Sequence, residues 1–376
     1  MSTSAQAAAW MDEALALAAK GLCTTHPNPR VGCVIVKDGQ CVGRGWHRRA
    51  GEPHAEVHAL REAGDAARGA TAYVTLEPCS HHGRTPPCAD ALIAAGVSRV
   101  VVAIEDPFPA VQGRGIERLR AAGIDVEVGV GATAAHELNL GFISRCTRQR
   151  PWVRLKLGMS LDGKIALADG RSQWITGAAA RADVQLWRAR SSAILTGIGT
   201  VRADDPRLTV RLDGPPERAP TRIVLDPSAS LSPQARLWHE AAPLLWVHAP
   251  AAELWPERPA WVQSLAIPAP GGQILLPRLM AALAERGENE ILVEAGPRLC
   301  GALLHQGLVD ELLLYIAPRI LGASARSAFE LPPLRELDDA EAWTLCEQRS
   351  LDGDLFLRLR APPPAPGWAE DFAAIS

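Results

Sequence analysis

A chain of 376 residues is longer than one ordinary domain, so two hydrophobic cores are expected. Apolar residues make up 47% of the sequence and charged residues 22%, which is the balance of a globular protein. The formal net charge of −3 provides no general positive field that would hold a nucleic-acid backbone.

The N-terminal segment, MSTSAQAAAWMDEALALAAK, has no basic leader and carries Asp12 and Glu13 within its apolar stretch. It therefore predicts an amphipathic helix and not a signal peptide. No apolar run reaches the length of a membrane span. We expect a cytoplasmic protein whose eight irregularly spaced cysteines stay reduced and form no disulfide framework.

Helix and strand patterns alternate through the first half of the chain. Asp38-Gly39 is a hairpin turn signal, and Gly64 and Gly96 are placed to end helices. We expect helices at 4–20, 54–64, 88–96 and 115–123, and strands at 31–36, 40–46, 71–76, 99–104 and 124–130. Strands joined by helices predict a mainly parallel sheet sandwiched between helices.

A second alternating series follows a polar, basic segment at 145–152, which we interpret as a linker. The Pro-rich tail, APPPAPGWAEDFAAIS, is expected to pack loosely or be disordered. Strands are expected at 152–157, 193–197, 222–226, 244–248, 291–296 and 311–317. The predicted domains are 1–146 and 147–361, followed by the tail at 362–376.

The stretch LEPCSHHGRTPPC, residues 76–88, places Cys79 and Cys88 around a loop of His, Gly and Pro. The pair has three interpretations: a disulfide, two core thiols, or two metal ligands that lack a third. A disulfide is disfavoured by the expected reducing compartment. His54, at the start of the helix just upstream, supplies an imidazole. Three ligands with one open position are typical of catalytic zinc and not of structural zinc.

Glu56 follows His54 by two residues, so on a helix the two side chains point in different directions. In the first turn, Glu56 can still lean over the open coordination position without acting as a ligand. That is the place for a proton shuttle between water and a leaving nitrogen. The order His-x-Glu followed by Pro-Cys is typical of zinc nucleobase deaminases, although here eight residues separate the cysteines where that pattern has two.

Less specific interpretations apply to the other candidates. Most cysteines on apolar segments are core thiols, which we expect for Cys23, Cys33, Cys41, Cys146, Cys300 and Cys346. His58 is interpreted as packing, because Ala55 stands where a zinc-protease motif needs Glu. His81 and His82 are interpreted as loop residues. A structural zinc would lack a fourth ligand.

The motif set PCSHHGRTPPC, HPNPRVGCVIV and GWHRRAGEPHAEVHAL resembles the pyrimidine deaminase of riboflavin biosynthesis, a branch of the cytidine-deaminase-like family. The resemblance covers most of residues 20–90. It implies that Asn28 and His47 contact the pyrimidine or ribose, and that Arg84 and Thr85 approach the substrate phosphate. A guanidinium suits that phosphate.

The second half carries weaker motifs. GIGTVRADDP, residues 197–206, has Arg202 where a dinucleotide fingerprint needs its third glycine. VEAGPRLCGALL, residues 293–304, predicts a strand, a Gly-Pro turn and a helix whose first N–H groups can cradle a phosphate. Together with KLGMSLDGKIA and RSQWITG, these stretches resemble the dihydrofolate-reductase-like reductase that accompanies the deaminase.

The reductase resemblance covers about residues 150–330 and implies NADPH as cofactor. By that resemblance, cofactor contacts are Gly158, Trp174, Thr200, Asp204, Pro227, Gly296, Pro297, Arg298 and Leu299. Substrate contacts are Ser172, Arg188, Leu208, Arg211 and Glu294, with Lys156 near the reacting sugar. The alternatives are that Trp174 packs in a core, that Arg188 and Arg211 lie on a solvated surface, and that Asp204 and Asp205 cap a turn.

The resemblance as a whole is to the bifunctional deaminase–reductase of riboflavin biosynthesis. It implies a cytidine-deaminase-like α/β/α sandwich with one zinc ion, followed by a dihydrofolate-reductase-like α/β domain that uses NADPH. The substrate would be a phosphorylated pyrimidine ribosylamine, 2,5-diamino-6-ribosylamino-4(3H)-pyrimidinone 5′-phosphate, deaminated and then reduced to 5-amino-6-ribitylaminouracil 5′-phosphate. We expect a homo-oligomer that binds neither nucleic acid nor membrane.

Two other functions remain open at this point. One is a nucleic-acid base deaminase with an unrelated second domain, which RNA binding would reveal. The other is a zinc-stabilised nucleotide-binding module, which would keep metal and NADPH without turnover.

Overall fold

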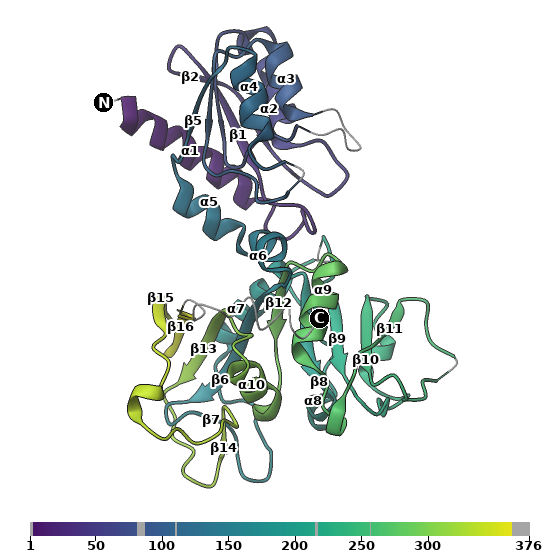
Figure 1. Cartoon of the computed structure of the whole chain (residues 1–376). Helices are drawn as coiled ribbons and strands as arrows, with labels where there is room; N and C mark the ends of the chain where they lie inside the picture. The colour runs from purple at the N-terminus through teal and green to yellow at the C-terminus, as the bar shows by residue number, and fades with distance from the viewer. Residues whose placement is uncertain (1–2, 81–86, 110, 215–216, 256, 363–376) are drawn as a thin grey trace. The chain divides into compact units, whose positions relative to one another are not determined.

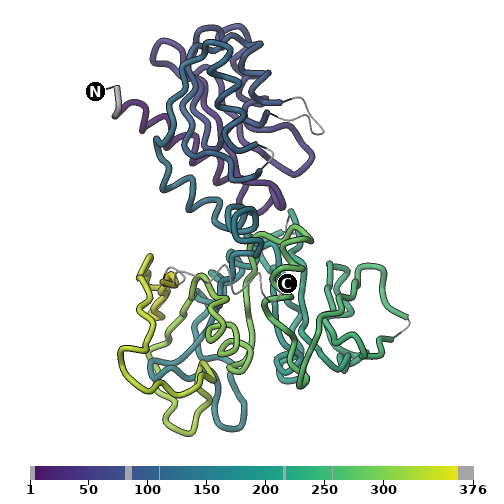
Figure 2. Tube along the Cα trace, in the orientation of Figure 1, coloured from purple at the N-terminus to yellow at the C-terminus, as the bar shows by residue number. Residues whose placement is uncertain are grey.

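The computed structural model describes residues 3–80, 87–109, 111–214, 217–255 and 257–362. The chain divides into two compact units, with the division between Gln149 and Arg150. This is three residues beyond the predicted boundary. Each unit has its own sheet and its own core (Figures 1 and 2). No helix in the described ranges combines the length and apolar character needed to cross a membrane.

The first unit is a five-stranded sheet in the order β2-β1-β3-β4-β5. The strands are β1 Gly32–Lys37, β2 Gln40–Trp46, β3 Thr71–Val74, β4 Arg99–Val102 and β5 Asp125–Val128. The pairs β1–β2 and β1–β3 are antiparallel, whereas β3–β4 and β4–β5 are parallel. The expectation of a mainly parallel sheet was therefore wrong for this unit, because the hairpin at Asp38-Gly39 reverses the chain.

Helices cover both faces of this sheet (Figure 1). They are α1 Thr3–Ala19, α2 Ala55–Ala63, α3 Cys88–Ala95, α4 Arg114–Ala121, α5 Ala132–Leu138 and α6 Leu140–Arg148. Alternate residues of one strand face opposite layers: Cys33 and Ile35 pack with α2, α3 and α4, while Val34 and Val36 pack with α1 and α5. The predicted α/β/α sandwich is confirmed.

The linker predicted at 145–152 was wrong in its first half, because α6 continues to Arg148. This helix buries Leu140, Phe142 and Ser144. Arg145 and Arg148 lie in its last turn, where positive charge favours the helix C-terminus. A basic run that looked like a connector is therefore the end of an amphipathic helix.

The second unit is a nine-stranded sheet in the order β11-β10-β9-β8-β12-β6-β13-β16-β15. Its strands are β6 Trp152–Ser160, β8 Ala193–Gly197, β9 Thr221–Leu225, β10 Leu244–His248, β11 Val262–Ala266, β12 Glu290–Val293, β13 Glu311–Ala317, β15 Thr344–Leu351 and β16 Asp354–Arg360. From β11 to β13 every pair is parallel, and β16 and β15 add an antiparallel edge. A separate small pair joins β7 Lys164–Ala166 to β14 Arg326–Ser327.

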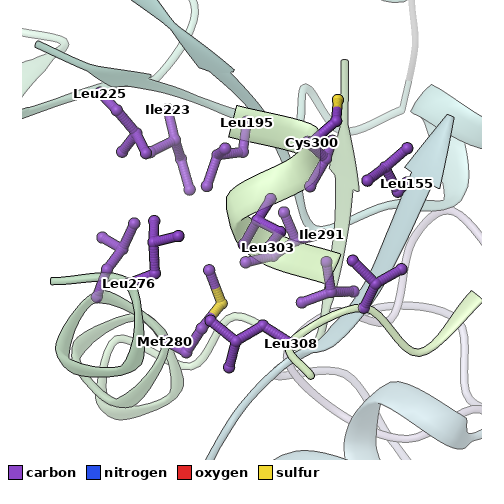
Figure 3. Close-up of a cluster of buried hydrophobic side chains, with 14 of the residues drawn as sticks. Leu155, Leu195, Ile223, Leu225, Leu276, Met280, Ile291, Cys300, Leu303 and Leu308 are labelled. Carbon is purple, nitrogen blue, oxygen red and sulfur yellow. The ribbon is translucent and has the colours of Figure 1, made fainter. Parts of the chain in front are cut away.

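The helices of this unit are α7 Ala178–Arg190, α8 Ile198–Asp204, α9 Leu276–Glu285 and α10 Pro297–His305. On one face, α9 and α10 pack on the strands through the core that includes Leu195, Met280 and Leu303 (Figure 3). On the other face, α7 and α8 pack on the same sheet in two further clusters. The carboxyl ends of the parallel strands thus share one edge, where ligands of α/β proteins bind.

Candidate active sites

The first site lies beyond the carboxyl end of β3, the central strand of its sheet. Cys79 is in the segment that follows this strand, and Cys88 is the first residue of α3. His54 is the N-cap residue of α2, where its extended backbone (φ −74°, ψ 168°) starts the helix. Three different elements thus each present one ligand.

The three side chains meet with the spacing of a metal centre. His54 Nδ1 lies 3.6 Å from Cys79 Sγ and 3.3 Å from Cys88 Sγ. All three ligand atoms lie within 4.8 Å of one another. Zn–S and Zn–N bonds of about 2.3 and 2.0 Å at a tetrahedral centre would place nitrogen roughly 3.5 Å from sulfur. Two thiolates and one imidazole are donors that zinc prefers, so these residues fit a zinc ion with a fourth position left for a non-protein ligand.

The protonation of the two cysteines also favours a bound cation. The hydrogen bond with the Cys88 thiol, together with His54 and the Cys88 backbone N–H (N···Sγ 3.3 Å), lowers the pKa of Cys79 to about 4. The same hydrogen bond, together with burial, raises the pKa of Cys88 well above its usual range. A divalent cation between the sulfurs would remove this conflict, because it stabilises both thiolates.

Glu56 lies in the first turn of α2 and is 3% exposed. Its Oε2 atom is buried without a hydrogen-bond partner among the described residues. Burial raises the pKa of this carboxyl group, and His54 partly opposes that shift. A buried carboxylate oxygen with nothing to bind is a polar atom that a water or a substrate nitrogen would satisfy.

Asn28 and His47 lie together beside the metal ligands. Asn28 Nδ2 donates to His47 Nε2 at 3.1 Å, and His47 Nδ1 donates to the Pro53 carbonyl at 3.3 Å. Burial lowers the pKa of His47, which agrees with a neutral ring. The rings of His47 and His54 meet edge to face, with centroids 5.3 Å apart. The structure therefore places both predicted substrate residues next to the metal site.

Several of the residues considered in the sequence are not among the described residues of this cluster. Arg84, Thr85, His81 and His82 lie outside the described residues. His58 is not part of the ligand cluster. None of the eight cysteines, all of which lie in the described ranges, forms a disulfide.

The predicted core thiols do not all behave alike. Cys33 and Cys300 are buried in the cores of the two units. The expectation of a core thiol was wrong for Cys346, which is exposed because β15 is the edge strand and turns this face to solvent.

The second site is a cavity of about 1890 Å³ at the carboxyl edge of the nine-stranded sheet. Pockets for single drug-sized ligands measure roughly 300–1,000 Å³, so this cavity has room for two molecules. Every described residue predicted for the reductase lines this cavity: Lys156, Gly158, Ser172, Trp174, Arg188, Thr200, Asp204, Leu208, Arg211, Pro227, Glu294, Gly296, Pro297, Arg298 and Leu299.

A buried ion-pair group forms one wall. Arg188 binds Glu294 through two bonds of 2.6 and 2.9 Å, and it also donates to the Thr209 carbonyl at 2.9 Å. Lys156 Nζ lies 3.7 Å from the same carboxylate. Burial opposes the charge of Glu294, but Arg188 and then Lys156 lower its pKa to about 2. Arg188 is thus buried against Glu294, and the alternative of a solvated Arg188 was wrong.

Arg211 differs from Arg188. It also lines the cavity, and its guanidinium has no ion-pair partner among the described residues. The backbone N–H of Arg211 donates to Oε1 of Gln185 at 2.9 Å. This leaves the guanidinium as a positive group available to an anionic ligand.

Trp174 is 62% exposed, so the alternative of a core residue was wrong. The guanidinium of Arg181 covers its ring at 4.5 Å. An exposed indole at a cavity wall is suited to stack on a planar ligand group. Asp205, rather than Asp204, holds a turn, because it accepts from the Arg236 N–H at 2.8 Å.

The turn from β12 into α10 also faces the cavity. Gly296 is the N-cap residue and Pro297 begins the helix, so the first N–H groups of α10 have no partner within the helix. A Cβ on Gly296 would meet only Thr200 Oγ1, at 3.8 Å. The backbone is therefore open to the cavity at this point.

The cavity lining also contains residues that the sequence did not predict, among them Arg181, Gln185 and Tyr315. A signal was present for two of them, because Arg181, Gln185 and Arg188 are spaced by four and three and share one face of α7. Tyr315 lay within an apolar strand and gave no signal. Its hydroxyl donates to Asp183 at 2.6 Å.

Comparison with known proteins covers both units. The family described as the cytidine and deoxycytidylate deaminase zinc-binding region matches residues 4–104, and the RibD C-terminal domain matches residues 151–351. The riboflavin biosynthesis protein RibD of Escherichia coli K12 is 53% identical over 362 residues, which cover 93% of this chain and 98% of that protein. The chain belongs to the RibD family.

Solved RibD structures agree with this assignment. Form 1 of Acinetobacter baumannii RibD has a TM-score of 0.88 at 44% identity and covers 96% of this chain and 100% of that one. A diaminohydroxyphosphoribosylaminopyrimidine deaminase/5-amino-6-(5-phosphoribosylamino)uracil reductase from Thermotoga maritima has a TM-score of 0.86 at 34% identity, covering 96% and 99% of the two chains. The chain is therefore a bifunctional deaminase and reductase of riboflavin biosynthesis.

RibD membership also decides between the functions left open by the sequence. Because one family spans both units, the second unit is the RibD reductase and not an unrelated addition to a nucleic-acid base deaminase. The cofactors are zinc for the deaminase and NADPH for the reductase.

Proposed function

We propose that the first unit hydrolyses the 2-amino group of 2,5-diamino-6-ribosylamino-4(3H)-pyrimidinone 5′-phosphate, and that the second then reduces the ribosyl group to a ribityl chain. The observation that carries the deaminase assignment is the buried, unpartnered Oε2 of Glu56 beside the His54, Cys79 and Cys88 cluster. This pairing supports a hydrolytic reaction in which a carboxylate moves protons.

In the deaminase site, His54, Cys79 and Cys88 would hold zinc, whose role is that of a Lewis acid that makes water nucleophilic near neutral pH. Glu56 accepts a proton from the attacking water and delivers it to the leaving nitrogen. The new C–O bond forms at C2, the C–N bond breaks, and ammonia leaves. The raised pKa of Glu56 suits this role, because a group that both takes and returns a proton works best near the operating pH.

Asn28 and His47 are proposed to orient the pyrimidine. Their hydrogen bond and the Pro53 carbonyl fix the His47 ring beside His54. The phosphate contacts assigned by resemblance to Arg84 and Thr85 stay predictions.

In the reductase site, NADPH would supply hydride to C1′ of the ribose. We propose that Arg211 binds the substrate phosphate, since its guanidinium lines the cavity and has no ion-pair partner in the described part of the chain. Lys156, held near Glu294, lies beside the sugar, and Arg188 fixes that carboxylate. The exposed ring of Trp174 forms a wall for the cofactor.

The direct test uses the purified protein with the diaminopyrimidine phosphate, with and without NADPH. Without NADPH, we expect ammonia and the uracil ribosylamine. With NADPH, we expect one NADPH oxidised per ribityl product. NADPH oxidation by the substrate before any ammonia is released would contradict the order of the two steps.

We also propose a cytoplasmic homo-oligomer that binds neither nucleic acid nor membrane. The net charge of −3 supports the first exclusion, and the reduced thiols needed as zinc ligands support the compartment. Light scattering after size-exclusion chromatography tests the oligomer.

A further inference from the structure

Helix α4 and the segment before it contact the chain on both sides of Cys79 and just after Cys88. Glu77, two residues before Cys79, is 3% exposed. Its carboxylate accepts four backbone N–H bonds from one segment of the chain: from Asp106 at 3.1 Å, Gly113 at 2.9 Å, Gly115 at 2.8 Å and Ile116 at 3.2 Å.

These bonds make Glu77 the N-terminal cap of a helix distant in sequence. Gly115 and Ile116 belong to the first turn of α4, where free N–H groups and the helix dipole favour a negative charge. The two segments also lie very close together: a Cβ on Gly115 would come within 2.0 Å of the Pro78 carbonyl oxygen. Position 115 must therefore be glycine for α4 to approach the residue that precedes Cys79.

One turn further along α4, Arg118 spans both ligand segments. Its Nη1 donates to the carbonyl of Ser80, which follows Cys79, at 3.2 Å. Its Nε lies 2.6 Å from Oδ1 of Asp90, which is two residues after Cys88. A planar guanidinium with several fixed donors can hold two such groups at a set separation.

We propose that Glu77 and Arg118 are positioning residues for the deaminase, which hold the Cys79 and Cys88 segments in register through α4. This inference rests on the proposed zinc role of the two cysteines. Neither residue touches the ligand atoms. They act on the separation of the sulfurs, and hence on zinc retention and on the turnover number. Partners outside the ligand sphere typically change metal affinity or activity by about 10–100-fold.

The test uses full-length Glu77→Gln and Arg118→Ala, with Arg99→Ala as a matched control. Each carboxylate oxygen of Glu77 accepts two N–H groups, so an amide loses two of the four acceptor positions whichever way it turns. Arg99 is as exposed as Arg118 (43% and 44%) and also pairs with carboxylates of the same domain, but those lie on β5, away from the cysteines.

Three kinds of quantity are measured: the rate of zinc release to a chromogenic chelator, the kinetic constants kcat and KM for deamination, and the reductase activity on pre-deaminated substrate. For Glu77→Gln we expect zinc release to accelerate by about 10–100-fold and kcat to fall, with KM little changed. Arg118→Ala should show the same pattern at roughly 3–10-fold, because water replaces part of an exposed contact. Arg118→Lys keeps the positive charge but lacks the planar guanidinium with its fixed donors, so it should not restore the wild-type values.

Arg99→Ala should match the wild type in all three quantities, and the reductase rate should be unchanged in every variant. The proposal is overturned if Arg118→Ala releases zinc and deaminates like the wild type, whatever Glu77→Gln does. Failure of the proposed function would look different, since the wild-type protein itself would then not retain zinc or release ammonia.

Discussion

At the scale of single residues, the deaminase site depends on side chains that contact one another and leave one buried carboxylate oxygen unsatisfied. Cys79 and Cys88 hydrogen-bond to each other and to His54, and Glu56 presents an oxygen with no partner among the described residues. Unsatisfied buried groups of this kind destabilise a fold unless a ligand or solvent satisfies them. The cluster is thus incomplete in chemical terms without a cation and a polar ligand.

Replacing Cys79 or Cys88 with Ser should therefore release zinc and abolish deamination, because a hydroxyl does not ionise to replace the thiolate. The reductase should still act on pre-deaminated substrate, since its cavity is built on the other sheet. Atomic absorption measures the metal content. Wild-type zinc in both variants would remove the cysteines from the ligand set.

Glu56→Gln should keep zinc and lose deaminase activity by about 10²–10⁴-fold, because an amide keeps the shape of the side chain but carries no proton. Metal analysis and ammonia release are measured on the same sample. Loss of zinc in this variant would instead identify Glu56 as a ligand.

At the scale of helices and strands, the turn from β12 to α10 makes a prediction for the cofactor. Gly296→Val should block NADPH sterically, because the added methyl groups enter the cavity, while the Cβ itself meets only Thr200 Oγ1, at an ordinary 3.8 Å. Its φ of −76° suits any residue, so the variant should fold.

Fluorescence titration measures NADPH affinity in this variant, with zinc content and deamination as internal controls. Wild-type affinity would exclude this turn from the cofactor site. We also expect NADPH to be preferred over NADH, and equal use of both would contradict the expected 2′-phosphate contact.

Glu311, the first residue of β13, leads to a prediction of how the stability of the second unit depends on pH. Burial disfavours ionised Glu311, but Arg154, Arg360 and Arg358 together hold its pKa at about 2. The unfolded value is about 4.3. This carboxylate therefore stabilises the second unit fully above about pH 4.3, and the stabilisation is lost as pH falls toward 2.

Protection of peptides from β6 and β13 against hydrogen exchange, relative to the intrinsic exchange rate at each pH, should accordingly weaken between pH 5 and 2 in the wild type. Glu311→Gln should exchange faster already at pH 7, because it removes the negative charge that pairs with Arg154, Arg358 and Arg360, and it should show a flatter pH dependence. Glu347→Gln, at a partly exposed acid on β15, is the control. The same steep pH dependence in Glu311→Gln would show that another group is responsible.

The elements that the sequence predicted share clear local signals. The buried strands of both sheets are apolar runs bounded by turns, and Gly96 ends α3 in the expected left-handed conformation. The hairpin of β15 and β16 was missed although Asp352-Gly353 repeats the signal of Asp38-Gly39, with the same positive φ angles. Its charged, half-exposed strands hid the alternation that buried strands show.

The prediction of the functional sites from the sequence has different limits. The cluster of His54, Cys79 and Cys88 was predictable because zinc restricts the type and spacing of its ligands so strongly. Long-range bonds were not, because the capture of four N–H groups by Glu77 joins segments about thirty to forty residues apart, and one sequence carries no sign of it.

At the scale of the whole molecule, each of the two units catalyses one of two consecutive reactions. The product of the first reaction is the substrate of the second. Because the sites belong to separate units, damage to one should leave the other intact. A mixture of Glu56→Gln and Gly296→Val chains should therefore make the ribityl product, although neither variant does so alone. Chromatography of the mixture measures this. No product, with each remaining activity intact, would mean that the intermediate does not pass between molecules.

The pair of sulfurs beside His54 has a last consequence, for the enzyme's resistance to oxidation. The sulfur atoms of Cys79 and Cys88 lie within 4.8 Å of each other, and the thiol of Cys79 is readily ionised. A thiolate facing a second thiol is the arrangement from which a disulfide forms when an oxidant is present. Zinc would occupy the electron pairs that an oxidant attacks. We therefore expect chelator treatment in air to inactivate the deaminase in a way that added zinc alone does not reverse, but a thiol reductant followed by zinc does.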